Sequence, residues 1–244
     1  TLLGVESLVS YEVKKLGLAD VRAENGRVLC TGTKKDIPRL NLNLRTGARV
    51  LILLGEFMAP NFEALFEGTY ALPWEEFIPR EGKFPVKGYA INSALHAVPT
   101  CQAMVKKAIA KRLGKVYGLE TLPETGVLYQ VQFAIFKDRA SLMLDTSGEG
   151  LYKRGYRAQG VAAPLKETLA AAMVALSRYK GKDPFCDPFC GSGTIAIEAA
   201  LIAKNRAPGL GRSFSCQKWT QLPSGLWVDA ADEAMDGEFD GNYE

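Results

Sequence analysis

The sequence contains a single histidine in 244 residues, and this scarcity excludes several kinds of site. A Ser-His-Asp triad would have to use His96, and a metal site built from several histidines cannot form. His96 lies among apolar residues in the stretch AINSALHAV, so we interpret it as a packed or surface histidine. Chemistry that depends on clustered imidazoles is therefore not expected.

Long apolar runs and paired cysteines are also missing. No apolar run reaches the roughly 18 residues that span a bilayer, and no signal peptide precedes Gly4, so no membrane association is expected. The five cysteines are an odd number in a long chain, which predicts free thiols and a cytoplasmic location. The net charge is only +3, so the distribution of charge says more about partners than its total.

The first 146 residues show the alternating pattern of an α+β region. Helices are predicted near residues 6–16, from about Pro38, and at 61–72 and 99–118. Strands are predicted at 49–57, 84–91, 128–136 and 140–146, with Asp138-Arg139 as the last turn. Asn25-Gly26 separates two short strands and predicts a hairpin with a type I′ turn. This order indicates a mixed sheet rather than half of a Rossmann fold.

The helix at 99–118 has one basic face. Apolar residues form a stripe at helical spacing, and lysines gather opposite it at positions 106, 107, 111 and 115. A solvated surface face is the simpler interpretation. The alternative is a phosphate-contacting face, for which Lys107 and Lys111 are the candidate RNA-binding residues.

The stretch SGEGLYKRGYRAQG (147–160) has no hydrophobic period and mixes glycines with basic and aromatic residues. Arginine and tyrosine together suit phosphate pairing and base stacking. We therefore take Lys153, Arg154 and Arg157 as further candidate RNA contacts. A flexible connector between two domains is the equally open alternative.

The stretch DPFCGSGTI (187–195) predicts a short strand, from about Pro184 to Pro188, followed by a glycine turn and a long apolar helix. Gly191 and Gly193 allow the backbone to approach a ligand closely, and the helix N-terminus offers free N–H groups. With Ala196 in the third position, the spacing also fits a dinucleotide fingerprint. The phosphate loop G-x-x-x-x-G-K-[ST] is absent.

The charge of Asp187 favours S-adenosylmethionine over NAD as the cofactor. A carboxylate beside the turn repels a pyrophosphate but suits the ammonium group of S-adenosylmethionine, so that cofactor is preferred over NAD. Cys186 and Cys190 lie four residues apart, but no further cysteine pair accompanies them, so no metal is expected.

Three stretches in order, LDTSGEGLYKRGYR (144–157), APLKETLAAAMV (163–174) and DPFCGSGTIAIEAALIAKNRAPGL (187–210), resemble the bacterial THUMP-domain RNA methyltransferases. The resemblance is strongest to the group that methylates guanine N2 in large-subunit ribosomal RNA. It implies S-adenosylmethionine as cofactor and ribosomal RNA as partner. The methyl group would pass directly to the exocyclic amine of a base that has been moved out of the base stack.

The resemblance also implies which residues surround the cofactor. One set lies in the loop and the other begins the preceding helix: Asp187, Phe189, Cys190, Gly191, Gly193, Lys166, Glu167 and Thr168. In fold, it implies a ferredoxin-like part (1–40), a THUMP domain (41–155) and the start of a Rossmann-like methyltransferase domain (156–244).

The sequence departs from the family in one respect. The family's catalytic (N/D)PP(Y/F/W) loop has no counterpart, because the chain contains no Pro-Pro pair. We therefore expect an incomplete methyltransferase that binds RNA without turnover, with no catalytic residue in this chain. A non-catalytic RNA-binding module and a DNA adenine-N6 methyltransferase are the alternatives.

Overall fold

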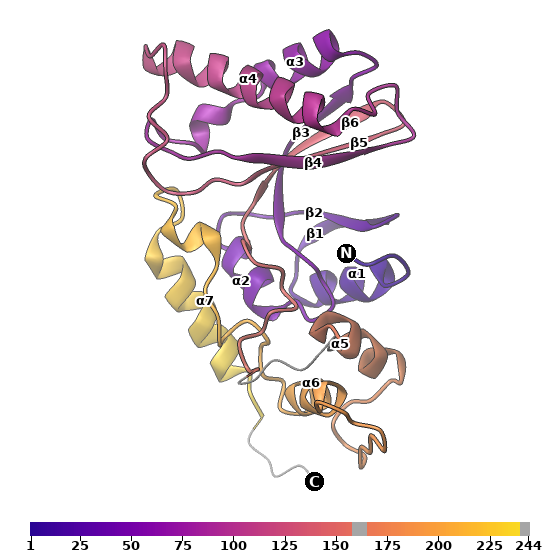
Figure 1. The fold of residues 1–244 in the computed structure, drawn as a ribbon. Coiled ribbons are helices and arrows are strands. Elements are labelled where there is room, and N and C mark those ends of the chain that lie inside the picture. Colours follow the sequence, from indigo (N-terminus) through magenta and orange to yellow (C-terminus); the bar gives the residue numbers. More distant parts are fainter. Residues whose placement is uncertain (158–164, 240–244) are drawn as a thin grey trace. The chain divides into compact units, whose positions relative to one another are not determined.

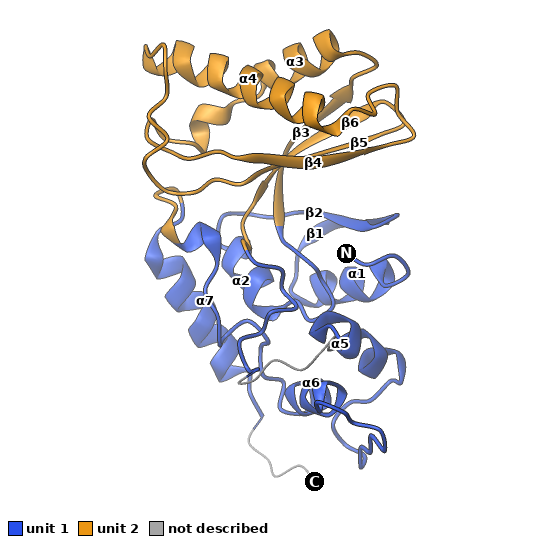
Figure 2. Ribbon diagram, in the orientation of Figure 1, with its two compact units in different colours: residues 1–50, 149–217, 222–244 blue, residues 51–148, 218–221 orange. Residues whose placement is uncertain are grey.

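The computed structural model describes residues 1–157 and 165–239, which form two compact units. Unit 1 comprises residues 1–50, 149–217 and 222–244, and unit 2 comprises residues 51–148 and 218–221 (Figure 2). The domain boundaries predicted after residues 40 and 155 stay a prediction.

Unit 2 is a four-stranded mixed sheet covered on one face by two helices (Figure 1). The strands lie in the order β3-β6-β5-β4, in which only the β4–β5 pair is parallel. The elements are β3 (Leu51–Met58), α3 (Phe62–Ala71), a 3-10 turn (Trp74–Glu76), β4 (Val86–Ile91), α4 (Val98–Tyr117), β5 (Val131–Phe136) and β6 (Arg139–Asp145). The mixed sheet that the sequence predicted is therefore confirmed.

The core of unit 2 lies between these helices and the sheet. The apolar stripe of α4 is buried as its spacing predicted, at Cys101, Val105, Ala108, Ile109 and Leu113. Alternate residues of β5 and β6 are fully buried beneath it, which is the pattern of a sheet with one covered face. The other face of the sheet carries several exposed apolar side chains.

The two hairpin turns differ from their predicted form. Between β5 and β6 the turn residues are Lys137 and Asp138, with φ of 49° and 60°, one position earlier than predicted. Between β1 (Ala19–Glu24) and β2 (Arg27–Thr31), only Gly26 has a positive φ, 77°. A type I′ turn requires positive φ at both central residues, so the prediction of type I′ at Asn25-Gly26 is wrong.

Unit 1 is mainly helical apart from the β1–β2 hairpin. Its other elements are α1 (Glu6–Lys15), α2 (Asp36–Asn43), α5 (Glu167–Leu176), α6 (Thr194–Ala203) and α7 (Ser224–Asp236), and a 3-10 turn (Ser215–Lys218) follows α6. The helix expected from Pro164 begins at Glu167, and Pro164 itself lies outside the described residues.

The strand predicted from Pro184 to Pro188 is not formed. A strand needs hydrogen-bonded neighbours, and the described residues of unit 1 contain no strand other than the β1–β2 pair. This part of the Rossmann-like prediction is therefore wrong for the described structure, although the glycine turn and the helix after it are present.

Candidate functional site

The DPFCGSG loop ends in a tight backbone turn at the start of α6. The Gly193 N–H donates to the Cys190 carbonyl at 2.7 Å, and Gly191 and Gly193 have φ of 51° and 73°. A Cβ added at Gly191 would meet no atom within 4 Å, so open space lies beside the turn. The N-cap residue of α6 is Gly193, which offers no side chain to cap the first turn.

Asp187 holds an unpartnered oxygen at the beginning of the loop. Its Oδ1 accepts a hydrogen bond from the Phe189 N–H at 3.2 Å. Its Oδ2 is buried and has no hydrogen-bond partner among the described residues. A buried carboxylate oxygen without a partner costs free energy, so a cationic donor from a ligand would stabilise this arrangement.

Arg157 connects the loop to the start of α5. Its Nε donates to Glu167 Oε1 at 2.6 Å, and its Nη2 donates to Thr194 Oγ1 and to the Leu165 carbonyl, both at 2.9 Å. Its Nη1 donates to Ser192 Oγ at 3.5 Å. Arg157 thus links the loop to the start of α5, and with 23% of its side chain exposed its assignment as an RNA contact stays a prediction.

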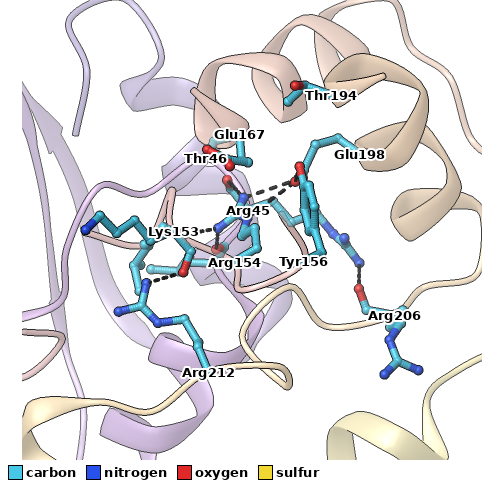
Figure 3. Close-up of polar contacts among 12 residues, drawn as sticks. Arg45, Thr46, Lys153, Arg154, Tyr156, Glu167, Thr194, Glu198, Arg206 and Arg212 are labelled. Atoms are coloured by element: carbon cyan, nitrogen blue, oxygen red, sulfur yellow. Dashed lines mark hydrogen bonds and ion pairs between the residues drawn. The ribbon is translucent and has the colours of Figure 1, made fainter. Parts of the chain in front are cut away.

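Arg154 is buried and pairs with Glu198 of α6, the helix that follows the loop (Figure 3). Only 3% of its surface is exposed, and its Nε lies 3.4 Å from Glu198 Oε1. Its Nη1 donates to the Leu151 carbonyl at 2.7 Å, and Tyr156 Oη donates to Glu198 Oε1 at 3.1 Å. A guanidinium that is buried and paired cannot reach an RNA phosphate, so the prediction of Arg154 as an RNA contact is wrong.

Burial sets the protonation of this cluster, which we call the Arg154 network (Glu12, Arg45, Arg154, Tyr156 and Glu198). Burial raises the pKa of the Glu198 carboxyl, while Arg154 and the Tyr156 hydroxyl oppose that shift. Burial and the nearby Glu198 raise the pKa of Tyr156, so its hydroxyl stays a donor. Burial lowers the pKa of Arg45, which Glu12 and Glu198 counteract.

The Arg154 network also reaches α1. Glu12 Oε1 accepts from Thr46 Oγ1 at 2.7 Å, and its Oε2 accepts from the Arg45 N–H at 2.8 Å. Burial raises the pKa of Glu12 as well. Figure 3 shows Arg154 and Tyr156 converging on Glu198, so polar contacts with these two residues fix the position of α6.

The remaining cofactor candidates lie around the loop. Phe189 is 93% exposed, and Cys190 and Gly191 are exposed beside it. Lys166 is the exposed N-cap of α5, whereas Glu167 and Thr168 are buried. Through Arg157, the structure brings Glu167 to the loop.

The remaining RNA candidates are exposed lysines. Lys107 and Lys111 lie on the outer face of α4 in unit 2, and Lys111 Nζ is 5.4 Å from the centre of the Phe66 ring. The basic face is narrower than predicted, because Lys106 pairs with Glu124 at 2.6 Å. Lys153, in unit 1, pairs with Glu149 at 2.5 Å but keeps 52% of its side chain exposed.

Sequence reasoning missed Glu198, Arg45, Ser192 and Thr194. One signal was available: Glu198 is the only charged residue within α6, TIAIEAALIA. A charge inside an apolar helix predicts a buried partner, although it does not say which residue supplies it.

The described ranges 1–157 and 165–239 contain no group of three or more His, Cys, Asp or Glu side chains suited to a metal ion. Within the same ranges, no helix combines the length and the apolar character needed to cross a membrane.

Three family profiles match successive parts of the chain. Residues 1–51 match the RlmL ferredoxin-like domain, residues 59–145 match the THUMP domain, and residues 154–238 match the RMKL-like methyltransferase domain. The chain is therefore similar, in order, to a ferredoxin-like, a THUMP and a methyltransferase domain. The resemblance to THUMP-domain methyltransferases is confirmed at this level, whereas the guanine-N2 target and the incompleteness of the chain stay predictions.

Individual relatives agree with these profiles. The Bacillus subtilis (strain 168) protein "Putative RNA methyltransferase YpsC" is 46% identical over 244 residues, which are 99% of this chain and 62% of the relative. A Listeria monocytogenes structure described as a "predicted N6-adenine-specific DNA methylase" is 48% identical, with a TM-score of 0.94 over 98% of this chain and 63% of that one.

A third relative was solved with a ligand. The structure of SMU.472 complexed with SAH is 42% identical, with a TM-score of 0.91 over 97% of this chain and 63% of that one. The chain therefore spans somewhat less than two thirds of the length of each of these relatives.

Proposed function

We propose that this chain forms the cofactor-loop and RNA-recognition part of an S-adenosylmethionine-dependent RNA methyltransferase. The observation that carries the proposal is the buried Asp187 Oδ2, which has no partner among the described residues and lies at the start of an open glycine turn. A carboxylate in this position suits a ligand that carries an ammonium group.

The choice of cofactor follows from charge. An unpartnered carboxylate attracts the ammonium group of S-adenosylmethionine and repels the pyrophosphate of NAD. The SAH complex of SMU.472 supports this choice. The residues proposed to surround the cofactor are Asp187, Phe189, Cys190, Gly191 and Gly193, together with Lys166, Glu167 and Thr168. When bound, the cofactor supplies an electrophilic methyl group on its sulfonium.

RNA is the proposed substrate because residues 59–145 match the THUMP domain and the Bacillus relative is named for RNA. Lys107, Lys111 and Lys153 are the proposed phosphate contacts. The finer proposal is the N2 amine of a guanine in large-subunit ribosomal RNA, in the cytoplasm. The sequence contains no Pro-Pro pair for an (N/D)PP(Y/F/W) loop, so we propose no catalytic residue within this chain.

DNA adenine methylation is the second candidate, favoured by the description of the Listeria structure. A DNA adenine methyltransferase would use the same cofactor loop as an RNA methyltransferase but would bind DNA. A non-catalytic RNA-binding module would bind RNA but no cofactor. Two binding measurements on one protein preparation therefore separate all three functions.

The first measurement is isothermal titration calorimetry of the 244-residue chain with S-adenosylmethionine, SAH and NAD. We expect binding of the first two and none of NAD, because only NAD brings a pyrophosphate to Asp187. Binding of NAD alone, or of no cofactor, would contradict the cofactor proposal.

The second measurement is competition between folded ribosomal RNA and duplex DNA of equal length for the same chain. We expect RNA to displace DNA, and a preference for duplex DNA would favour the adenine methyltransferase. We also expect no methyl transfer to ribosomal RNA by this chain alone, so observed transfer would contradict the expected absence of a catalytic loop.

A further inference from the structure

One face of the unit 2 sheet is left open by α3 and α4, and its side chains belong to no site described above (Figure 1). The strand pairing places the residues of this open sheet face in three rows. The rows are Ile91–Phe136–Arg139–Met58, Tyr89–Ala134–Ser141–Glu56 and Lys87–Gln132–Met143–Leu53.

Two aromatic rings stand on the open sheet face. Tyr89 is 55% exposed and Phe136 is 49% exposed, although both lie within regular strands. Tyr89 pairs with Ala134, and Phe136 lies two residues further along β5, so the two rings are diagonal neighbours. Beside them lie two small side chains, that of Ala134, which is partly exposed, and that of Ser141, which is buried.

The apolar surface around the rings is interrupted by charge. Ile91 is 50% exposed and Met58 is 57% exposed, but Arg139 lies between them in the same row with 57% of its side chain exposed. Lys87 is exposed on the edge strand β4, and Lys137 Nζ lies 5.5 Å from the centre of the Phe136 ring. An exposed charge on an edge strand disfavours pairing with another protein strand.

The acidic groups of the face are already engaged. Glu56 Oε1 accepts a hydrogen bond from Ser141 Oγ at 2.5 Å, and Glu56 Oε2 lies 3.8 Å from Arg139 Nη1. Asp145 is 1% exposed and accepts from Gln132 Nε2 at 2.9 Å. The exposed charge that remains, on Lys87 and Lys137, is positive, so the face is complementary to a polyanion.

We propose that the open sheet face binds single-stranded RNA. Tyr89 and Phe136 stack on unpaired bases, and Lys87, Lys137 and Arg139 contact the phosphates between them. Exposed rings interleaved with basic side chains on a sheet are the combination that holds single-stranded nucleic acid, because every base has a face that can stack. The inference rests on the proposed function and deepens it by naming a second RNA surface within unit 2.

This surface differs chemically from the lysines of α4, which lie on the covered side of the sheet. Lys107 and Lys111 can pair with phosphates of duplex or single-stranded RNA alike, because they carry no ring. The open sheet face requires bases that have left a duplex. The two surfaces therefore predict different responses to strandedness and to salt.

The test is fluorescence anisotropy of the 244-residue chain with a labelled single-stranded RNA of mixed sequence and with the matching duplex. We expect the double variant Tyr89→Ala/Phe136→Ala to bind the single strand about tenfold more weakly or worse, with duplex binding unchanged. The slope of log affinity against log salt concentration should stay the same, because no phosphate contact is lost. The variant Lys107→Ala/Lys111→Ala should instead reduce that slope by about one to two for both RNAs.

Two control variants separate stacking from general damage. Tyr89→Phe/Phe136→Tyr keeps both rings and should bind like the wild type. Tyr11→Ala removes a ring that is 69% exposed on α1 in unit 1, and it should leave single-strand binding unchanged. Melting curves by circular dichroism establish that each variant is folded. As a second measurement, RNA carrying 5-iodouridine should crosslink to Tyr89 or Phe136.

Three results would overturn the inference. In the first, the folded double variant binds the single strand as well as the wild type. In the second, crosslinks appear only on other residues. In the third, sedimentation shows that the wild type is a dimer that Tyr89→Ala/Phe136→Ala dissociates. If the wild type binds no RNA at all, the RNA part of the proposed function fails too, and SAH calorimetry on the same sample tells whether the cofactor part survives.

Discussion

The two units of the molecule are stabilised in different ways. Of the largest fully buried side chains, Trp74, Tyr129, Phe84 and Phe133 belong to unit 2, as do all the others except Leu151. Unit 1 buries alanines of α5 and α6 and, in contact with α6 after the cofactor loop, the Arg154 network. Unit 2 has a conventional apolar core packed on its sheet, whereas the helix after the candidate cofactor loop of unit 1 contacts buried charged groups.

The difference matters because the two kinds of interior respond differently to change. Apolar packing is non-directional and roughly proportional to buried area. A buried ion pair depends on both partners, and removing one partner leaves an uncompensated charge. The loop of unit 1 is therefore placed by a few specific contacts, and single substitutions in those contacts should have large effects.

The largest expected effect is that of Arg154→Ala. The substitution leaves the Glu198 carboxylate, which is 0% exposed, without its cationic partner. We expect the free energy of unfolding to fall by roughly 3–5 kcal/mol, measured by urea denaturation. The matched control is Lys153→Ala, one position earlier, whose exposed pair with Glu149 should contribute far less, because solvent screens it. If both variants lowered the free energy of unfolding equally, unit 1 would not depend on its buried ion pair.

A smaller effect is expected from two helical glycines, one in each unit. A Cβ at Gly68 of α3 would lie 2.3 Å from the Phe57 ring, whereas a Cβ at Gly225 of α7 would meet nothing within 4 Å. Both Gly→Ala changes gain helix propensity, but only Gly68→Ala overpacks an apolar interior. We expect Gly225→Ala to be the more stable of the two by about 1–3 kcal/mol, measured by thermal denaturation. A difference near zero would mean that unit 2 is loosely packed around Phe57.

The smallest expected effect is a difference in pH dependence between two carboxylates. Burial raises the pKa of Glu198 in unit 1, and the hydrogen bond from Arg112 lowers the pKa of Glu75 in unit 2. A carboxyl group whose pKa is higher in the folded state stabilises the fold at pH values below its unfolded-state pKa. That contribution is lost as the pH rises through the folded-state pKa. A lowered pKa stabilises the fold above the unfolded value and is lost as the pH falls through the folded pKa.

We therefore expect wild type to lose stability relative to Glu198→Gln as the pH rises above the ordinary glutamate pKa of about 4.3. Relative to Glu75→Gln, wild type should gain stability as the pH rises through about 4.3 from below. Urea denaturation of the three proteins from acid to neutral pH measures both trends. Two profiles of the same sign would contradict the assignment of Glu198 as a carboxylate that is destabilised by burial.

The same contrast explains which parts the sequence predicted. In unit 2, the stripe of α4 and the alternation of β5 and β6 carry their own period, so their buried faces could be predicted from spacing alone. Arg154 and Arg157 in unit 1 were predicted as RNA contacts, because a glycine-rich basic stretch has the same composition whether its arginines face solvent or a buried carboxylate. Their partners, Glu198 and Glu167, lie 44 and 10 positions away, beyond the reach of any local pattern.

The strand predicted before the glycine turn failed for a related reason. Residues 184–188 have the composition of a short strand, but a strand depends on neighbours that local sequence does not specify. The glycine turn itself was predictable, because Gly191 and Gly193 adopt the positive φ that their residue type allows. The unpartnered Asp187 Oδ2 was not, since burial of a single atom depends on the whole surrounding structure.

The most direct test of the cofactor assignment is a pairwise binding cycle at Asp187. SAH and its analogue without the α-amino group are titrated calorimetrically into wild type and into Asp187→Asn. If Asp187 holds the ammonium group, wild type should bind SAH about tenfold more tightly or better than the analogue, and Asp187→Asn should lose that preference. An equal preference in both proteins, or a preference for the analogue in wild type, would contradict the assignment.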